Sequence, residues 1–376
     1  LSAYECGFEP FERDDGLHPY GPYNPNPKYD DYLRSKGYNS QNPWDDHANS
    51  GISENGDRLS GWLLKNSNLA ADVDEEHSET PYMTQRAIDF MKEAGNQPWL
   101  CHLSYIKPHW PYIVPKPYYN MYNAKHIIPP IRDDKEKETN HPVFKAFIES
   151  KYCRTFARDD VRERVIPAYM GLIKQIDDQL GILFSWMRRN GLFENTMIVF
   201  TSDHGYHMGE HGHWQKTTLF ENATRVPLII AGPGVGQVGK ASDAIVEMVD
   251  IYPTMVELAN LTPPKSVSGV SLAPVLEDVT AIVRTSALTQ YNNGYSIRTN
   301  RYRYTEWGEK GELGLELYDH ENDPAELINL SGKPQASDVQ KEMQIQLHTR
   351  IEEANVPPVG VKQNTFVNGR RVPQPN

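Results

Sequence analysis

Cysteine is scarce in this sequence of 376 residues, which holds only Cys6, Cys101 and Cys153. Three cysteines do not make a disulfide framework, and they say little about the compartment of the protein. No apolar run approaches the ~20 residues that span a bilayer, so we expect no membrane span. Positive charge is also in deficit, with 38 Lys and Arg against 50 Asp and Glu. This balance argues against a nucleic-acid partner, but it leaves room for a small anionic substrate, which needs only a few local cations.

The chain also lacks a signal segment at its start. Residue 1 is Leu, and no charged stretch followed by an apolar one comes after it. We therefore expect the numbering to begin inside a longer protein. The 28 prolines and 21 tyrosines indicate long ordered loops, since aromatic residues are interleaved throughout.

The apolar pattern predicts an α/β architecture. Residues 1–77 show little periodicity and are predicted to be loops, Glu79–Ala94 is predicted to be a helix ending at Gly95, and Trp99–Ser104 a strand. A longer helix is predicted by an apolar stripe at intervals of three or four, formed by Val165, Tyr169, Leu172, Ile176, Leu180, Leu183 and Met187. A strand at Asn195–Thr201 follows it. The repeated strand, loop and helix predict a mainly parallel sheet sandwiched by helices.

The pattern of predicted secondary structure changes near residue 285. Before it, Ala244–Val249 is predicted to be a strand and Tyr252–Ala259 a helix. After it come short aromatic strands separated by turn residues, and then a polar helix at about Ser337–Asn355. The sequence therefore predicts a large domain over residues 1–285 and a smaller α+β domain with an antiparallel sheet over 286–376.

The most informative motif is an apolar run, Met197–Phe200, that leads through two polar residues into Asp203, His204 and Gly205. A carboxylate and an imidazole at the carboxyl end of a buried strand are well placed to bind a divalent metal. Gly205 would permit tight passage of the backbone. The alternative is that Asp203 caps the next turn and His204 is an ordinary polar residue.

Two further segments carry candidate anion-binding cations. Lys216 lies thirteen residues after Asp203, where a loop would return it to the same pocket. A solvated surface lysine is the competing interpretation, and spacing alone does not choose between them. His109 and Lys107 follow the predicted strand in a loop with flanking prolines, which suits a residue held in position to bind an anion or protonate a leaving oxygen. A packed loop histidine and a solvent-facing lysine are the alternatives.

Three other groups of polar residues carry weaker functional predictions. His207, His211 and His213 have no recognised metal-binding spacing, so at most one is expected to line the pocket, and His211 is the candidate. Asp177 and Asp178 lie beside the helical stripe and are predicted to be solvated or salt-bridged. The charge run from Asp133 to Glu138 is predicted to be solvated surface.

Several separated motifs together resemble the sulfatase branch of the alkaline phosphatase superfamily. Residues 200–230 (FTSDHGYHMGEHGHWQKTTLFENATRVPLII) are similar to iduronate-type sulfatases, and residues 107–112 (KPHWPY) look like the phosphonate monoester hydrolases. Residues 268–272 (SGVSL) and 316–319 (ELYD) resemble later landmarks of the same family. The motifs appear in family order over about residues 80–331.

The resemblance implies that Asp203 and His204 ligate a divalent metal, Ca²⁺ foremost with Mn²⁺ or a similar ion as the alternative. It implies that Lys216 and His109 bind the substrate anion and act in catalysis. Lys107 and His211 are predicted, from their places in the two loops, to bind the same anion. The family's nucleophile is a formylglycine made from a cysteine in a C-x-P-S-R type motif, and none of the three cysteines here fits that motif. We therefore expect residues 1–285 to be the carboxyl-terminal portion of a sulfatase catalytic domain, with the nucleophile upstream and the fragment alone inactive.

The predicted activity is hydrolysis of an organic sulfate ester, for which a sulfated saccharide is one candidate substrate. A phosphonate monoester or phosphodiester hydrolase is the alternative, favoured by the His109 loop. A catalytically dead binding relative is a third reading, supported only by the missing nucleophile motif. Tyr20, Tyr23, Trp110 and Tyr112 would suit stacking on a sugar or aryl group, with a structural role equally open. The resemblance favours a periplasmic or secreted location.

Overall fold

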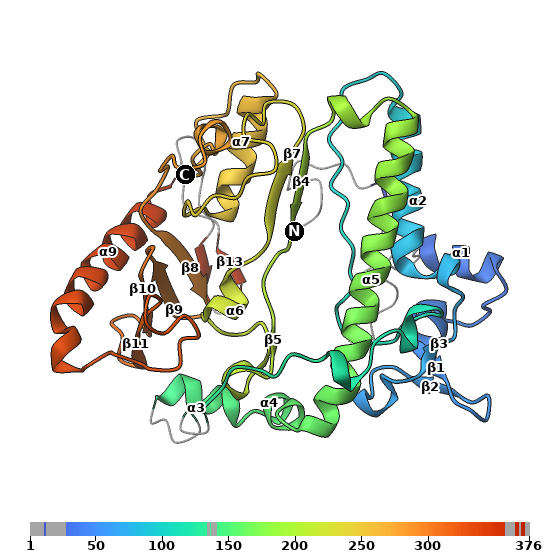
Figure 1. The fold of residues 1–376 in the computed structure, drawn as a ribbon, viewed down its shortest axis with the longest axis horizontal. Coiled ribbons are helices and arrows are strands. Elements are labelled where there is room, and N and C mark those ends of the chain that lie inside the picture. The colour runs from blue at the N-terminus through green and yellow to red at the C-terminus, as the bar shows by residue number, and fades with distance from the viewer. Residues whose placement is uncertain are drawn as a thin grey trace. The chain divides into compact units, whose positions relative to one another are not determined.

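The computed structural model describes residues 11–12, 28–133, 136, 141–357, 365–367 and 370–372. The chain divides into two compact units, drawn together in Figure 1. The first unit comprises Leu1–Pro129 with Thr155–Phe193, and the second comprises Pro130–Arg154 with Glu194–Asn376. Each unit is described by itself.

The first unit is mainly helical. Its regular elements are α1 (Lys28–Ser35), α2 (Glu79–Ala94), α5 (Asp159–Arg189) and a small antiparallel sheet of β1 (Ser50–Ile52), β2 (Arg58–Ser60) and β3 (Ala70–Ala71) in the order β2-β1-β3. Short helical turns cover Trp44–Ala48, Leu64–Asn66, Glu75–His77, Tyr118–Asn120 and Ala124–His126. Helix α4 (Lys151–Phe156) crosses the boundary between the units.

The two long helices of the first unit were predictable from their apolar spacing. Helix α2 has the predicted bounds and ends at Gly95, whose positive φ of 56° suits glycine. It lies beside α5 (Figure 1), and buried residues of both form one core cluster, Ile88, Met91, Leu183 and Met187. Burying a side chain of this kind contributes about 1.5–3 kcal/mol, which outweighs the modest helix propensity of any one residue.

Two predictions for the first unit were wrong. Residues 28–77 are not only loops, because they hold α1 and the three short strands. Residues 99–104 form no strand: their side chains alternate between half-buried and exposed, as in an extended segment, but no ladder pairs them. Strand assignment requires a partner, and none lies beside this segment among the described residues.

The second unit combines short helices with antiparallel strands. Its elements are α3 (Pro142–Ile148), β4 (Ile198–Thr201), β5 (His207–Met208), β6 (Trp214–Gln215), α6 (Glu221–Thr224), β7 (Leu228–Ala231), α7 (Ile251–Leu258), α8 (Ala273–Glu277), β8 (Ala287–Tyr291), β9 (Gly294–Arg298), β10 (Tyr302–Trp307), β11 (Gly314–Asp319), α9 (Ser337–Asn355), β12 (Thr365–Val367) and β13 (Arg370–Val372). Short helical turns cover Phe193–Asn195, Glu210–Gly212, Met248–Asp250 and Pro334–Ala336.

A four-stranded sheet, ordered β11-β10-β9-β8, forms the carboxyl-terminal part of this unit. Helix α9 packs against it (Figure 1), and their shared core contains Ile297, Tyr304, Leu317, Met343 and Leu347. The aromatic strands and the polar helix predicted after residue 285 are thus confirmed, including the bounds of α9.

Strands β4 and β7 form a separate two-stranded sheet. They pair antiparallel, with Phe200 opposite Ile229, and these two side chains are 39% and 58% exposed. The α/β class is confirmed, but every ladder in the described part of the chain is antiparallel, whereas the sequence predicted a mainly parallel sheet. Among these residues no further strand pairs with β4 or β7.

The region between β7 and the small sheet also differs from expectation. The strand predicted at Ala244–Val249 is absent, and a helical turn, Met248–Asp250, leads directly into α7. Glu247 accepts hydrogen bonds at its side chain from Leu288 and from Arg350 of α9, so it serves as an anchor rather than as part of a ladder. These contacts span residue 285, and the predicted boundary there stays a prediction.

No helix within the described residues has both the length and the apolar character needed to cross a bilayer.

Two glycines of α5 offer a matched test of its packing. A Cβ added at Gly171 would lie 2.9 Å from the Tyr118 carbonyl oxygen, whereas one added at Gly181 would meet nothing within 4 Å. We expect Gly181→Ala to stabilise the protein by up to about 1 kcal/mol, through helix propensity, and Gly171→Ala to destabilise it. Thermal or denaturant unfolding measures both, and an equal gain in the two variants would contradict this packing.

Candidate active site

The turn after β4 brings a carboxylate and an imidazole together. Asp203 Oδ2 lies 3.3 Å from His204 Nε2, and the His204 backbone N–H donates to Asp203 Oδ1 at 3.1 Å. The Asp203 side chain is 81% exposed and that of His204 28%. The next residue, Gly205, donates its backbone N–H to the Ala223 carbonyl at 2.8 Å. A Cβ at Gly205 would lie 2.1 Å from the Asn222 carbonyl oxygen, so this passage requires glycine, as predicted.

These two side chains fit a divalent cation. His204 Nδ1 lies 2.8 Å from the Gly205 carbonyl oxygen, which only accepts, so Nδ1 carries the proton and Nε2 presents a lone pair. Two ligand atoms at ~2.3–2.6 Å from one calcium ion and about 90° apart would lie roughly 3.3–3.7 Å from each other. The observed separation of 3.3 Å agrees with shared ligation.

The segment after Gly205 is a closed loop that returns to the same place. The Gly205–Ala223 hydrogen bond joins its ends, and β5 pairs with β6 inside it. At its tip His211 adopts a positive φ of 56°, next to Gly212 with a φ of 68°. Such a backbone conformation costs about 1–3 kcal/mol in a residue other than glycine, so tertiary contacts must hold it.

Three histidines of this loop are buried together. His207 Nε2 lies 2.7 Å from the Thr218 hydroxyl, His213 Nδ1 donates to the His211 carbonyl at 3.0 Å, and His211 Nδ1 lies 2.6 Å from Glu136 Oε1. Burial lowers the pKa of His213 to about 4, and burial with the neighbouring His213 and His211 lowers the pKa of His207. His207 and His213 are therefore neutral at pH 7.

Aromatic rings fix the orientation of this cluster. The His211 ring stacks on Phe220 with centroids 4.0 Å apart and planes 10° apart, and Phe144 of α3 meets it edge-on at 6.5 Å. Phe144 also packs against His213 at 5.0 Å. The nitrogens of the three histidines do not converge on one point, in agreement with the absence of a metal-binding spacing.

Lys216 follows β6 and is exposed. It belongs to the same unit as Asp203 and His204, but no hydrogen bond or ion pair joins it to either among the described residues. Its assignment to the anion-binding site stays a prediction, since a free ammonium at this position suits a ligand and solvent equally.

The other two predicted anion-binding residues lie in the first unit. Lys107 is 8% exposed, and its Nζ lies 3.3 Å from Glu79 Oε2 and donates to Asn49 Oδ1 at 2.8 Å. His109 is exposed, with Nδ1 2.6 Å from the Trp110 carbonyl oxygen. The structure thus gives Lys107 internal partners that the sequence did not indicate, and the substrate-binding role of both residues stays a prediction.

The remaining candidates have structural contacts or lie outside the described residues. Asp178 is salt-bridged to Lys174 and accepts from the Tyr118 hydroxyl at 3.0 Å, as the predicted salt-bridged reading requires. Tyr112 is 1% exposed, and Trp110 packs edge-on against Trp62. The three residues Cys6, Tyr20 and Tyr23 lie outside the described residues.

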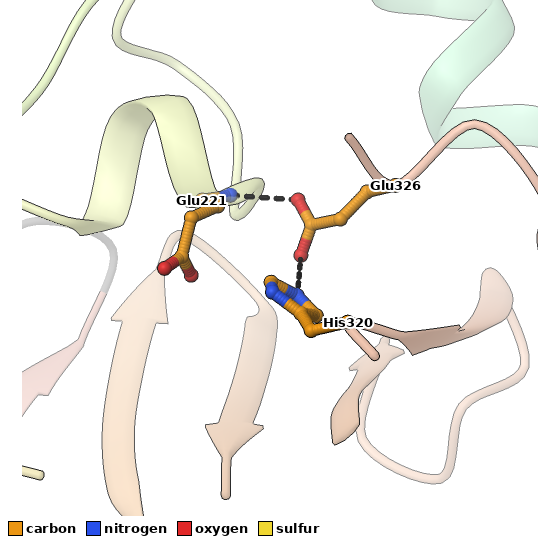
Figure 2. A group of neighbouring side chains, drawn as sticks. All are labelled: Glu221, His320 and Glu326. Atoms are coloured by element: carbon orange, nitrogen blue, oxygen red, sulfur yellow. Dashed lines mark hydrogen bonds and ion pairs between the residues drawn. The ribbon is translucent and has the colours of Figure 1, made fainter. Parts of the chain in front are cut away.

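A second group with metal-ligand chemistry lies between α6 and the small sheet. Figure 2 shows Glu221, His320 and Glu326 gathered around one point. Arg298 donates to His320 Nδ1 at 2.9 Å, so His320 Nε2 carries the proton that it donates to Glu326 Oε1 at 2.8 Å. Both ring nitrogens are therefore used, and neither is left to bind a metal.

Arginines neutralise the carboxylates of this second group. Arg303 is 2% exposed, donates to Glu326 Oε1 at 2.6 Å and also bonds to Glu221. Burial would raise the pKa of Glu326, but the Arg303 charge and the hydrogen bonds from His320 and the Glu221 amide outweigh it and lower the pKa to about 2. We interpret the group as a buried ion-pair network that anchors α6, not as a metal centre.

Glu136 is the residue of this site that sequence reasoning missed. It belongs to a charge run predicted to be solvated, yet its side chain is only 9% exposed and it contacts His211, 75 residues away. No local pattern distinguishes it from its acidic and basic neighbours, so only a long-range signal would have found it.

Two protein-family models match overlapping parts of this chain. Residues 15–261 match the family model described as sulfatase, and residues 209–353 match that of the carboxyl-terminal region of N-sulphoglucosamine sulphohydrolase. An arylsulfatase of Clostridium perfringens is 30% identical over 272 residues, covering 68% of this chain and 54% of the relative. The chain spans about half the length of the curated relatives it matches.

Solved structures give the same fold. A phosphonate monoester hydrolase from Silicibacter pomeroyi superposes with a TM-score of 0.77 at 22% identity, covering 92% of this chain and 72% of the other. A protein solved in complex with its substrate D-glucosamine-2-N,6-O-disulfate superposes with a TM-score of 0.59 at 20% identity, covering 96% and 87%. The fold is thus alkaline phosphatase-like, with a small carboxyl-terminal sheet domain.

The buried His213 should make stability depend on pH. Its pKa falls from 6.5 to about 4 on folding, so the folded protein binds this proton less tightly than the unfolded chain does. The contribution of the neutral ring is complete above pH 6.5 and is lost as the pH falls through 4. We expect the unfolding free energy of the wild type, relative to that of His213→Gln, to drop by roughly 3 kcal/mol across this window.

Denaturant unfolding of both proteins at closely spaced pH values measures that difference. A difference that stays constant between pH 6.5 and 4 would show that His213 is not held neutral by burial.

Proposed function

The chain belongs to the sulfatase family, and from this premise we propose that it forms part of an active site that hydrolyses sulfate esters and releases sulfate. The observation that carries the proposal is the pairing of Asp203 and His204 at the end of β4, with ligand atoms 3.3 Å apart and a free lone pair on His204. The identity to an arylsulfatase supports the same chemistry.

A divalent metal is the cofactor that this pair would hold, with Ca²⁺ as the first candidate and Mn²⁺ or a similar ion as the alternative. The mixed oxygen and nitrogen donors suit either kind of ion. When bound, the metal would act as a Lewis acid on a substrate oxygen. Asp203 supplies the negative charge that attracts the cation, and the hydrogen bond from His204 to the Gly205 carbonyl fixes the ring that faces it.

The cationic residues are proposed to bind the ester's anionic group. Lys216, without a protein partner among the described residues, would neutralise one of its oxygens, and His211 is proposed to line the same site with its Nε2. Binding of an anionic group is also proposed for His109 and Lys107, on the basis of the sequence motif that they share. For Lys107 this role requires that its ammonium serve the substrate in addition to Glu79.

The nucleophile is proposed to be a formylglycine that lies upstream of residue 1. The two cysteines that the structure describes do not fit this role, because neither has the maturation motif and Cys153 is only 5% exposed. No step of the reaction is therefore assigned to a cysteine of these residues. A chain that spans about half of its relatives leaves room for the nucleophile elsewhere in the protein.

A phosphonate monoester or phosphodiester hydrolase is the second candidate function. The fold likeness to a phosphonate monoester hydrolase favours it, and the same metal and cations would serve a phosphoryl centre. The natural sulfate ester is proposed to be a sulfated saccharide, because one structure of similar fold holds a disulfated glucosamine. A periplasmic or secreted location is proposed with it.

The deciding experiment compares turnover of an aryl sulfate and an aryl phosphonate by the protein expressed from its complete reading frame. Faster turnover of the sulfate supports the sulfatase. Dominant turnover of the phosphonate would favour the second candidate, and metal binding without turnover of either would point to a binding relative.

Asp203→Ala should remove the metal and most of the activity, because Asp203 provides negative charge to the cation at this end of β4. Metal content of the purified protein and turnover with added metal measure the effect. Asp177→Ala, at an exposed position of α5, is the control. Unchanged metal content in Asp203→Ala would refute the ligand assignment.

Lys216→Ala and His109→Ala should each lower the turnover number by about 10²–10³, the usual loss when a positioned donor to developing charge is removed. Steady-state kinetics of the complete protein measure this loss. Wild-type rates in either variant would place that side chain outside the pocket.

A further inference from the structure

A carboxylate from a distant segment holds the ring of His211. Glu136 Oε1 lies 2.6 Å from His211 Nδ1, and the two side chains are 9% and 1% exposed. The other oxygen, Oε2, accepts the backbone N–H of Asp133 at 2.9 Å, and the Glu136 N–H donates to the Asp133 carbonyl at 3.0 Å. Both carboxylate oxygens are thus fixed before any ligand arrives.

This contact decides which nitrogen of His211 carries the proton. An ionised carboxylate only accepts hydrogen bonds, so the proton of the neutral ring lies on Nδ1 and Nε2 holds the lone pair. No partner for Nε2 is recorded among the residues that the structure describes. Glu136 therefore determines that Nε2, and not Nδ1, is the His211 nitrogen available to a ligand.

The rest of the environment holds the ring without adding charge. Phe220 stacks on one face and Phe144 meets it edge-on, while the titratable groups His207 and His213 lie with ring centroids 5.8 Å and 6.4 Å from that of His211. Both of these histidines are kept neutral by burial, which lowers their pKa. Glu136 is accordingly the one charged group recorded against the ring in the described part of the chain.

A purely structural role does not account for this arrangement. A buried polar pair of this kind is weak evidence for a role in stability, because replacing it by apolar side chains is often neutral or stabilising. His211 also holds a φ of 56°, a conformation that costs free energy and that glycine would adopt without strain. His211 thus has a strained backbone, a ring held by Glu136 and a nitrogen without a recorded partner. These three features indicate that the ring is held for a ligand.

We propose that Glu136 is a positioning residue of the active site, which fixes His211 as the Nδ1–H tautomer so that the lone pair of Nε2 can accept a hydrogen bond from a hydroxyl group of the bound substrate. The proposal rests on the proposed hydrolase function and adds to it a residue outside the motifs of the sequence. Glu136 acts through His211 and does not itself touch the substrate.

The kinetic test uses Glu136→Gln in the complete protein, with Glu149→Gln as the control. Glu149 is exposed at the end of α3, so its substitution removes the same charge without touching His211. We expect Glu136→Gln to lower kcat by about 10–100-fold with KM changed less than about threefold, as losing an orienting partner typically does. An unchanged kcat, or a loss confined to KM, would overturn the proposal.

A second readout does not depend on activity. Nitrogen-15 chemical shifts of the His211 ring, assigned with His211→Asn, report which nitrogen carries the proton. We expect Nδ1–H in the wild type and a loss of that preference in Glu136→Leu, whose side chain has similar volume and accepts no hydrogen bond. Nδ1–H in both proteins, or Nε2–H in the wild type, would overturn the proposal even if the enzyme is active.

The two readouts separate this inference from the proposed function. If the complete protein hydrolyses neither ester but Glu136→Leu shifts the tautomer, the hydrolase function fails while the control of His211 by Glu136 stands. If turnover is normal and the tautomer does not respond, the function stands and Glu136 has no positioning role. Where Glu136→Leu does not fold, the tautomer in Glu136→Ala gives the same decision, since alanine likewise accepts no hydrogen bond from Nδ1.

Discussion

The ion pair between Arg303 and Glu326 is the constraint on which the geometry of the site depends. The Arg303 and Glu326 side chains are only 3% and 1% exposed, so removing either charge would leave the other buried without a counter-ion. Through Glu221, which bonds to Arg303 and donates its backbone N–H to Glu326, the pair fixes the start of α6. Helix α6 carries Ala223, the acceptor for Gly205. The turn that carries Asp203 and His204 is thereby tied to the small sheet by a short series of buried contacts.

Where one local signal sufficed, the sequence predicted the structure. The apolar stripe of α5 and the glycine after α2 are signals contained within single segments. Each indicates a helix, and both helices form as predicted. The short aromatic strands between turn residues likewise specify β9 and β10, because each pairs with a neighbour close in sequence. The Asp203–His204 turn belongs to this group, since two adjacent residues made it visible.

Contacts between distant segments were not predictable. Residues 99–104 have the alternation of a strand, but a ladder depends on a partner that the segment itself does not encode. Glu136 looks like any member of a charge run, and its burial depends on a histidine 75 residues away. Arg303 reads as one polar residue of an aromatic strand, although it is the charge that holds Glu221 and Glu326 together.

The anchoring of α6 has a thermodynamic consequence. If the strands around Arg303 melted, Glu221 and Glu326 would lose their counter-ion, so the loop carrying Asp203 and the small sheet are coupled into one cooperative unit. A ligand that binds only the folded state raises the free energy of unfolding of everything that unfolds with its site. A cation held by Asp203 and His204 would therefore protect β10 and α9 from heat and from amide hydrogen exchange, although it touches neither.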